Sequence, residues 1–117
     1  MKGVELQTYG MTLMLKDDEG IVDRYRQYHR DAWPEVIAGL RAIGIAEMRI
    51  YLLGRRLFMY MEAVDGFSPE RDFPKLAEDA RYREWDELMR GFQQPAPEAR
   101  AGEWWAPMEE VFDLSRK

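Results

Sequence analysis

One segment of the chain combines a histidine with two aromatic residues at helical spacing. His29 is the single histidine among 117 residues, and Tyr25 and Trp33 lie four residues before and after it. A helix places residues four apart near one face, one turn from each other. Histidine gains or loses a proton near neutral pH, because its reference pKa is about 6.5. The spacing predicts a proton-transfer site flanked by aromatic rings, and packing in a core or an interface is the alternative.

Three glutamates are the next candidates for acid–base chemistry. Glu62 ends one predicted strand, and Glu109 and Glu110 lie in another. Adjacent residues of a strand point to opposite faces, so at most one of Glu109 and Glu110 faces a given pocket. A solvated strand edge is the alternative for all three, since glutamate is mostly exposed in folded proteins.

Four tryptophans are many for a chain of this length. Trp85 belongs to an apolar helical stripe, which predicts a core position. Trp104 and Trp105 lie instead in an irregular stretch flanked by glycine and proline. Aromatic residues in loops often line ligand sites, so this pair is a candidate for contact with a flat ligand or a sugar ring.

Composition excludes several classes of function. The chain has no cysteine, which excludes disulfides, thiolate catalysis and cysteine-bound zinc, and one histidine leaves few ligands for another metal. We therefore expect no metal, and no cofactor, since no phosphate-binding glycine loop is present. A net charge of -5 without a basic run argues against nucleic acid and anionic membranes. No apolar run reaches the length of a membrane span or a signal peptide, so we expect a cytoplasmic protein.

Periodicity predicts one α+β domain over residues 1–117. The expected strands cover residues 8–16, 46–53, 57–63 and 108–114. One helical segment begins near Ile21, is broken near Pro34 and resumes to Ile43, and a second covers residues 71–92. This β-α-β-β-α-β order is that of a ferredoxin-like fold, with two helices on one face of a four-stranded antiparallel sheet.

The third predicted strand is apolar on both faces. Met59 and Met61 point to one side, and Phe58 and Tyr60 to the other. A one-sided antiparallel sheet normally has a polar outer face. We therefore expect the second face to be covered by another copy of the chain, as a homodimer.

Beyond these patterns, an ordered series of short motifs is similar to a known family. The series is Leu15-Lys16-Asp17-Asp18, Tyr25-x-x-x-His29, Trp33-Pro34-Glu35, Met48-x-Ile50-Tyr51-x-Leu53-Gly54, Arg56-Leu57-Phe58-Met59-x-Met61-Glu62, Asp65-Gly66-Phe67, Phe92-Gln93-Gln94-Pro95, Gly102-Glu103-x-Trp105 and Met108-Glu109. In these motifs the chain resembles the L-rhamnose mutarotase family, and within it the L-fucose mutarotase branch. The motifs are individually weak, but their order and spacing along nearly the whole chain make them specific.

The resemblance implies a dimeric α/β barrel type of ferredoxin-like fold, paired through the sheets, and cofactor-free acid–base catalysis. It implies that His29 transfers the proton and that Tyr25 contacts the sugar. Members similar to the rhamnose enzyme carry a Trp-Trp pair where this chain has Glu84-Trp85, and a tyrosine in place of Met48. Both departures favour the fucose branch.

The resulting hypothesis is a mutarotase that interconverts the α and β anomers of a 6-deoxy hexose, L-fucose before L-rhamnose. The expected substrate-binding residues are Tyr25, Trp33, Tyr51, Glu84, Trp85, Trp105 and Glu109, with Gln93 as a further guess. The second acid–base group is Tyr25, a carboxylate such as Glu109 or Glu62, or a bound water. A cofactor-independent monooxygenase and a non-catalytic sugar-binding protein are the alternatives from other classes, because a fold does not determine function.

Overall fold

Three long strands form the body of an antiparallel sheet in the computed structural model, which describes residues 6–117. They are β1 (Leu6–Leu15), β2 (Ile45–Leu53) and β3 (Arg56–Val64). β3 lies between the other two, and β2 joins it through a two-residue turn at Gly54 and Arg55. Gly54 adopts a φ of 61°, a conformation that glycine tolerates best and that suits a tight hairpin.

The fourth position of the sheet is filled by two short strands. β4 (Gln93–Gln94) pairs with Met14 and Leu15 of β1, and β5 (Ala106–Met108) pairs with the same strand over Gly10 to Thr12. The strand order is therefore β2-β3-β1-β4, with β5 also beside β1. This arrangement confirms the predicted ferredoxin-like α+β sheet.

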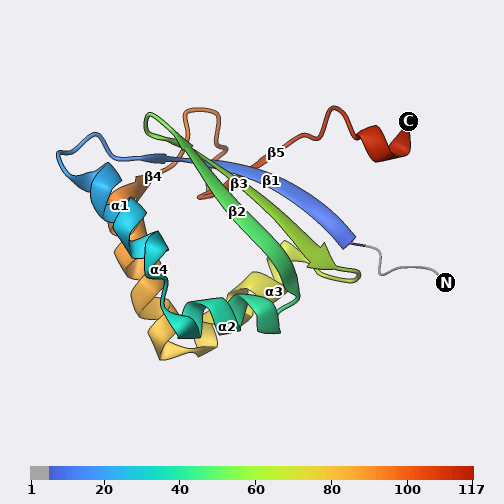
Figure 1. Ribbon diagram of the computed structural model, residues 1–117, viewed down its shortest axis with the longest axis horizontal. Helices are drawn as coiled ribbons and strands as arrows, with labels where there is room; N and C mark the ends of the chain where they lie inside the picture. The colour runs from blue at the N-terminus through green and yellow to red at the C-terminus, as the bar shows by residue number, and fades with distance from the viewer. Residues whose placement is uncertain (1–5) are drawn as a thin grey trace.

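The prediction of a last strand over residues 108–114 is wrong. β5 ends at Met108, and η2 (Leu114–Arg116) is a single 3-10 turn. Val111 and Phe112 are 84% and 61% exposed, so within this chain the weak alternation buries no apolar face that would hold the segment against β1. Beyond β5 the chain leaves the sheet and extends away from the body (Figure 1).

Two helices between β1 and β2 meet at Pro34, as predicted. α1 (Ile21–Arg30) is followed by α2 (Pro34–Ala42), which has its proline in the first turn and Trp33 as N-cap. Proline fits a first helical turn because that position needs no N–H donor. Gly44 follows α2 with a φ of 106°, the left-handed conformation that commonly follows the C-terminus of a helix.

The second helical region is divided, whereas periodicity predicted one segment over residues 71–92. It consists of α3 (Pro69–Asp72), the 3-10 helix η1 (Phe73–Glu78) and α4 (Ala80–Phe92). Pro74 cannot continue an α-helix beyond its first turn. Asp79 has an extended conformation, and its carboxylate accepts a hydrogen bond from the N–H of Arg81, so that it caps the N-terminus of α4.

All the α-helices lie on the concave side of the curved sheet (Figure 1). Leu13, Leu15, Leu57 and Met61 are fully buried between the two layers, and Met59 faces the same way. Phe58 and Tyr60 point to the opposite face, so the predicted division of β3 is confirmed.

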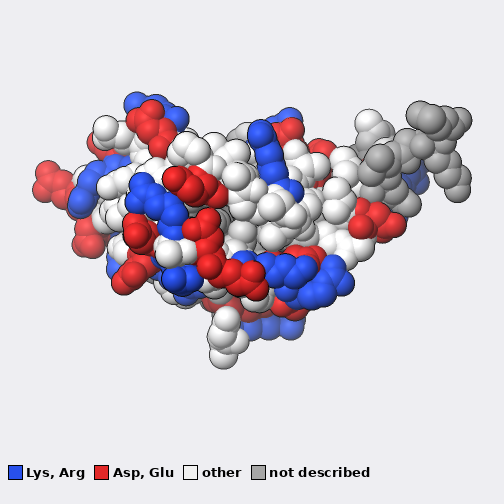
Figure 2. All heavy atoms as spheres, turned by 90° about the horizontal axis from the view of Figure 1, so that it is seen from below, with Lys and Arg blue, Asp and Glu red and all other residues white. Residues whose placement is uncertain are grey.

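The surface on the helical side carries acidic and basic side chains in alternation, without an extended patch of one sign (Figure 2). Many are short-range helical pairs such as Arg90 with Asp86, 3.0 Å apart. Among residues 6–117, no helix has the length and apolar character needed to cross a bilayer.

Candidate active site

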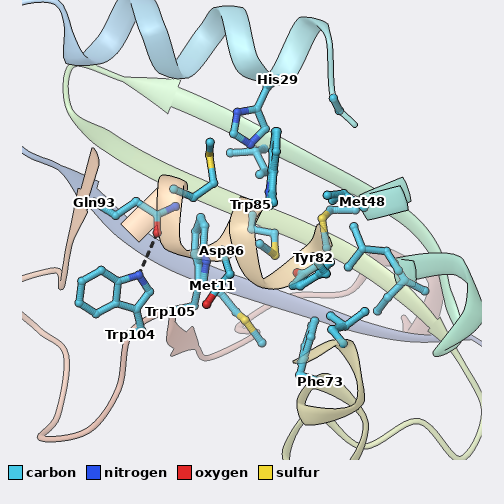
Figure 3. A pocket seen from close by; sticks show the side chains of 18 of the residues that line it. Met11, His29, Met48, Phe73, Tyr82, Trp85, Asp86, Gln93, Trp104 and Trp105 are labelled. Atoms are coloured by element: carbon cyan, nitrogen blue, oxygen red, sulfur yellow. Dashed lines mark hydrogen bonds between the residues drawn. The ribbon is translucent and has the colours of Figure 1, made fainter. Parts of the chain in front are cut away.

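A cavity of about 1430 Å³ lies between the concave face of the sheet and the helices. Its floor is formed by apolar side chains of β2 and β3, including Met48, Ile50 and Met59. Its walls come from α1, α4 and the segment that connects β4 to β5. His29 and Trp85 enter it from α1 and α4 and lie next to each other, whereas Trp104 lies farther away, next to Gln93 (Figure 3).

The hydrogen bonding of His29 determines which nitrogen carries the proton. Nδ1 lies 2.9 Å from the backbone carbonyl oxygen of Tyr25, one turn earlier in α1. A carbonyl oxygen only accepts, so Nδ1 must be the donor, and in the neutral ring Nε2 keeps its lone pair. Burial lowers the pKa of His29 below its ordinary 6.5, although the bond to Tyr25 acts in the opposite direction. His29 is therefore neutral at pH 7 and offers a base at Nε2.

Tyr25 supplies a neutral hydroxyl beside that base. Its ring lies 4.2 Å from the imidazole ring, centroid to centroid, and both side chains line the cavity. Burial raises the pKa of Tyr25 to about 12, while a hydrogen bond from Gln93 at 3.3 Å lowers it in part. The predicted constellation of Tyr25 and His29 therefore places a base and a protonated acid next to each other.

Trp85 forms an aromatic wall beside the imidazole. Its ring centroid is 5.3 Å from that of His29 and 5.2 Å from that of Trp33, both edge to face. Trp33 does not line the cavity; it supports Trp85 from behind, with the Arg81 guanidinium 3.6 Å above its ring. Trp33 lies behind this wall because Pro34 ends α1, so that the tryptophan caps α2 instead of extending the face of α1.

The structure brings together only part of the expected substrate-binding set. Trp105 lines the cavity. Tyr51 lies on the opposite face of the sheet, stacked on Phe58 with 6.0 Å between ring centroids. Glu84 points to solvent and pairs with Arg81 at 2.8 Å.

The candidate glutamates Glu109 and Glu62 do not line the cavity that holds His29. Glu109 is exposed just beyond β5, outside the cavity. Glu62 accepts a hydrogen bond from the hydroxyl of Tyr60 at 2.7 Å, on the outer face of the sheet. Of the groups considered as partner for His29, Tyr25 is the one that shares its cavity.

Several cavity residues were not singled out as site residues from the sequence. Met48 and Ile50 form part of the floor, and Asp86 and Arg90 line the wall from α4. Strand parity could have found the first two, because residues 48, 50 and 52 are apolar whereas 47 and 49 are charged. Trp104, which the sequence analysis named with Trp105 as a candidate for ligand contact, also lines the cavity, and its indole N–H donates to Gln93 at 2.8 Å.

Within residues 6–117, no three histidine, aspartate or glutamate side chains gather closely enough to hold a metal ion. The chemistry that these residues can perform is proton transfer between a neutral imidazole, a phenol and a polar ligand.

Comparison with known proteins identifies the family. The model of a family described as L-rhamnose mutarotase matches residues 8–114. The chain belongs to this family. The predicted resemblance is thereby confirmed, and with it the isomerase class of the enzyme, since named members are mutarotases.

Individual relatives cover nearly the whole chain. An L-fucose mutarotase of Xanthomonas campestris pv. campestris is 35% identical over 114 residues, 96% of this chain and 91% of its own. A UPF0734 protein of Dictyostelium discoideum is 44% identical over 118 residues, 97% and 94% of the two chains. The crystal structure of an L-rhamnose mutarotase from Formosa agariphila aligns with a TM-score of 0.67 at 24% identity, over 92% of this chain and 98% of that one. This last likeness supports the fold.

Proposed function

We propose that this chain is a mutarotase that interconverts the α and β anomers of L-fucose by acid–base catalysis without a cofactor. The observation that carries the proposal is the contact of His29 with Tyr25. It leaves Nε2 of a neutral imidazole as a base beside a protonated phenol, in one cavity. Membership of the mutarotase family and 35% identity to an L-fucose mutarotase support this assignment.

Mutarotation opens a cyclic hemiacetal and closes it again on the other face of the aldehyde. In the proposed reaction, Nε2 of His29 removes the proton of the anomeric hydroxyl while the Tyr25 hydroxyl delivers a proton to the ring oxygen. The bond between that oxygen and the anomeric carbon breaks, which leaves an open-chain aldehyde. After rotation of the aldehyde, ring closure returns both protons to their donors. A positioned acid and base typically contribute about 10²–10⁴-fold each to such a step.

The lining of the cavity supports a 6-deoxy sugar as substrate. The faces of Trp85 and Trp105 can cover the apolar side of a sugar ring and its methyl group. Of the two departures from rhamnose-like members, only Met48 lies in the cavity, because Glu84 is directed to solvent. The preference for L-fucose over L-rhamnose therefore depends on Met48 and on the similarity to the L-fucose mutarotase.

The test is NMR saturation transfer between the anomeric protons of L-fucose and of L-rhamnose, with and without protein. We expect faster exchange for L-fucose than for L-rhamnose. His29→Ala should lower the protein-dependent rate by at least about 100-fold. Gln27→Ala, an exposed position on the same helix, is the matched control and should keep the wild-type rate. Unchanged exchange for both sugars would overturn the proposal, and sugar binding without exchange would favour the non-catalytic alternative.

We further propose that the outer face of the sheet pairs with a second copy to form a homodimer. This face exposes a set of large apolar side chains: Tyr51 at 54%, Leu53 at 85%, Phe58 at 36%, Val64 at 41% and Met108 at 49%. Tyr51 and Phe58 stack on one another within this face, and exposed apolar clusters commonly mark interaction surfaces. The match to the predicted two-sided apolar strand supports pairing through the sheets.

Sedimentation equilibrium tests the homodimer. Phe58→Glu places a charge at the centre of the outer face, so we expect the dissociation constant of the dimer to rise by about 10-fold or more. Ile37→Glu is the control, because Ile37 is a similarly exposed apolar residue, at 40%, on the helical side. A monomeric wild-type protein would refute the pairing.

A further inference from the structure

Gln93 is a buried polar residue with a hydrogen bond at each end of its amide. It follows α4 directly, in β4, and is 4% exposed. Its Oε1 lies 2.8 Å from the indole nitrogen of Trp104, and its Nε2 lies 3.3 Å from the Tyr25 hydroxyl oxygen. The amide therefore joins the segment after β4 to the reacting face of α1.

The orientation of this amide is fixed by chemistry. The indole nitrogen of tryptophan donates and has no lone pair to accept with, so the atom facing it must be the carbonyl oxygen of Gln93. The NH₂ group must then face Tyr25 and donate to its hydroxyl oxygen. A flipped amide would leave two donors facing each other at the Trp104 end, a buried arrangement that is costly.

Trp104 is itself held in place from α4. The guanidinium of Arg90 lies 4.9 Å above its ring, and Arg90 pairs with Asp86 at 3.0 Å. A cation over an aromatic face restrains the ring as well as attracting it. Arg90 of α4 therefore fixes the position of Trp104, and Trp104 in turn fixes the Gln93 amide, although Trp104 itself lies in an irregular segment.

The direction of the Gln93 bond decides what the Tyr25 hydroxyl can do. The oxygen already accepts from Gln93, and within residues 6–117 no hydrogen bond uses the phenolic hydrogen as donor. That hydrogen is free to point into the cavity. With one lone pair engaged by Gln93 and its hydrogen unengaged, the hydroxyl meets a ligand as a donor.

We propose that Gln93 is a positioning residue that holds the Tyr25 hydroxyl as proton donor toward the sugar ring oxygen, with Trp104 fixing the amide. This inference deepens the proposed mutarotase function and rests on it. The geometry also separates the roles of the two reacting groups, because His29 is held as acceptor by its bond to the Tyr25 carbonyl while Tyr25 is held as donor by Gln93.

The decisive variant is Gln93→Glu, which keeps the shape of the side chain and reverses one hydrogen bond. A carboxylate accepts from Trp104 with one oxygen and from the Tyr25 hydroxyl with the other. The phenolic hydrogen then turns away from the cavity, and the donor to the sugar is lost. We expect kcat for anomer exchange at about pH 8 to fall by about 100-fold, with a much smaller change in KM, as for loss of a general acid.

Protonation of the introduced carboxylate should restore activity to the same variant. A protonated carboxyl group has one O–H donor and one carbonyl acceptor, the same pattern as the amide. Burial raises the pKa of a carboxyl group above its usual value of about 4.3. The ratio of Gln93→Glu activity to wild-type activity should therefore rise as pH is lowered from about 8 to about 5. A purely structural role of Gln93 would leave this ratio constant.

Two further variants keep the outcome decisive. Gln94→Glu places the same charge at the next residue, which does not line the cavity, and should keep wild-type activity. Trp104→Phe removes the donor that fixes the amide and should lower kcat by about 10-fold, even if Gln93→Glu does not fold. A Gln93→Glu enzyme within twofold of wild type, a pH-independent ratio, or an unaffected Trp104→Phe would overturn the inference. An inactive wild-type protein would instead overturn the proposed function.

Discussion

Protonation of His29 should abolish the catalysed exchange, and the structure fixes the form of the pH profile. Nδ1 already carries the hydrogen that it donates to the Tyr25 carbonyl, so an added proton can enter only at Nε2. There it removes the lone pair that accepts the anomeric proton. Because burial lowers the pKa of His29 below 6.5, the active neutral form predominates at pH 7.

The pH dependence of kcat/KM should reflect the protonation of His29 and Tyr25. We expect kcat/KM to be constant at neutral pH and to fall tenfold per unit once the pH drops below the pKa of His29. The midpoint should lie below 6.5, and two units under it the loss is about 100-fold. No decline is expected up to about pH 10, because Tyr25 stays protonated with a pKa of about 12. Other charged side chains line the same cavity and act electrostatically on His29. They are Arg26, Arg30, Arg41, Glu47, Glu70, Arg83, Asp86, Arg90 and Glu103.

Saturation transfer on L-fucose anomers, measured with and without protein at each pH, gives this profile directly after subtraction of the uncatalysed exchange. An acid midpoint above 6.5 would mean that the charged imidazole is stabilised and would refute the role of His29 as a neutral base. Loss of activity between about pH 7 and about pH 10 would assign the acid to a group other than Tyr25.

Two further predictions concern stability and specificity. Gly44→Ala should lower the free energy of unfolding by about 3 kcal/mol, because a Cβ would lie 2.8 Å from Val64 Cγ2 at a φ of 106°, whereas Gly54→Ala has no such neighbour and should cost about 1 kcal/mol. Urea denaturation of the pair measures this, and equal losses would contradict the steric argument. Met48→Tyr should change the ratio of kcat/KM for L-fucose over L-rhamnose by about 10-fold in favour of L-rhamnose, since it alters the floor of the cavity. An unchanged ratio in saturation transfer would show that Met48 does not contribute to the choice of sugar.

Much of the sheet could be predicted because strand burial has a period of two residues. Met59 and Met61 face the helices and Phe58 faces outward, as their alternation indicated. Pro34 divided the first helical region where its missing N–H required a division. The pairing of Tyr25 with His29 was predictable for the same kind of reason, since a four-residue separation on a helix is a local property.

The two misses have different causes. Tyr51 was named as a residue that binds a sugar hydroxyl, although its strand parity groups it with the charged residues 47 and 49 on the outer face. Gln93 has the sequence context of a helix end, and its role emerges only when Trp104 and Tyr25 meet it from elements distant in the chain. Hydrogen bonds between side chains far apart in sequence are set by the tertiary fold, which local patterns do not encode.

The division of the fourth strand into β4 and β5 has a consequence for how the protein folds. β1, at the start of the chain, completes its pairing only when residues near positions 93 and 106 return to it. Such non-local pairings are entropically slow to form, whereas α1 and the β2–β3 hairpin close over short loops. Trp104 and Trp105 reach the cavity only in that last docking step, since they lie between the two short strands. In refolding experiments, the return of anomer exchange should therefore lag behind the return of helical circular dichroism.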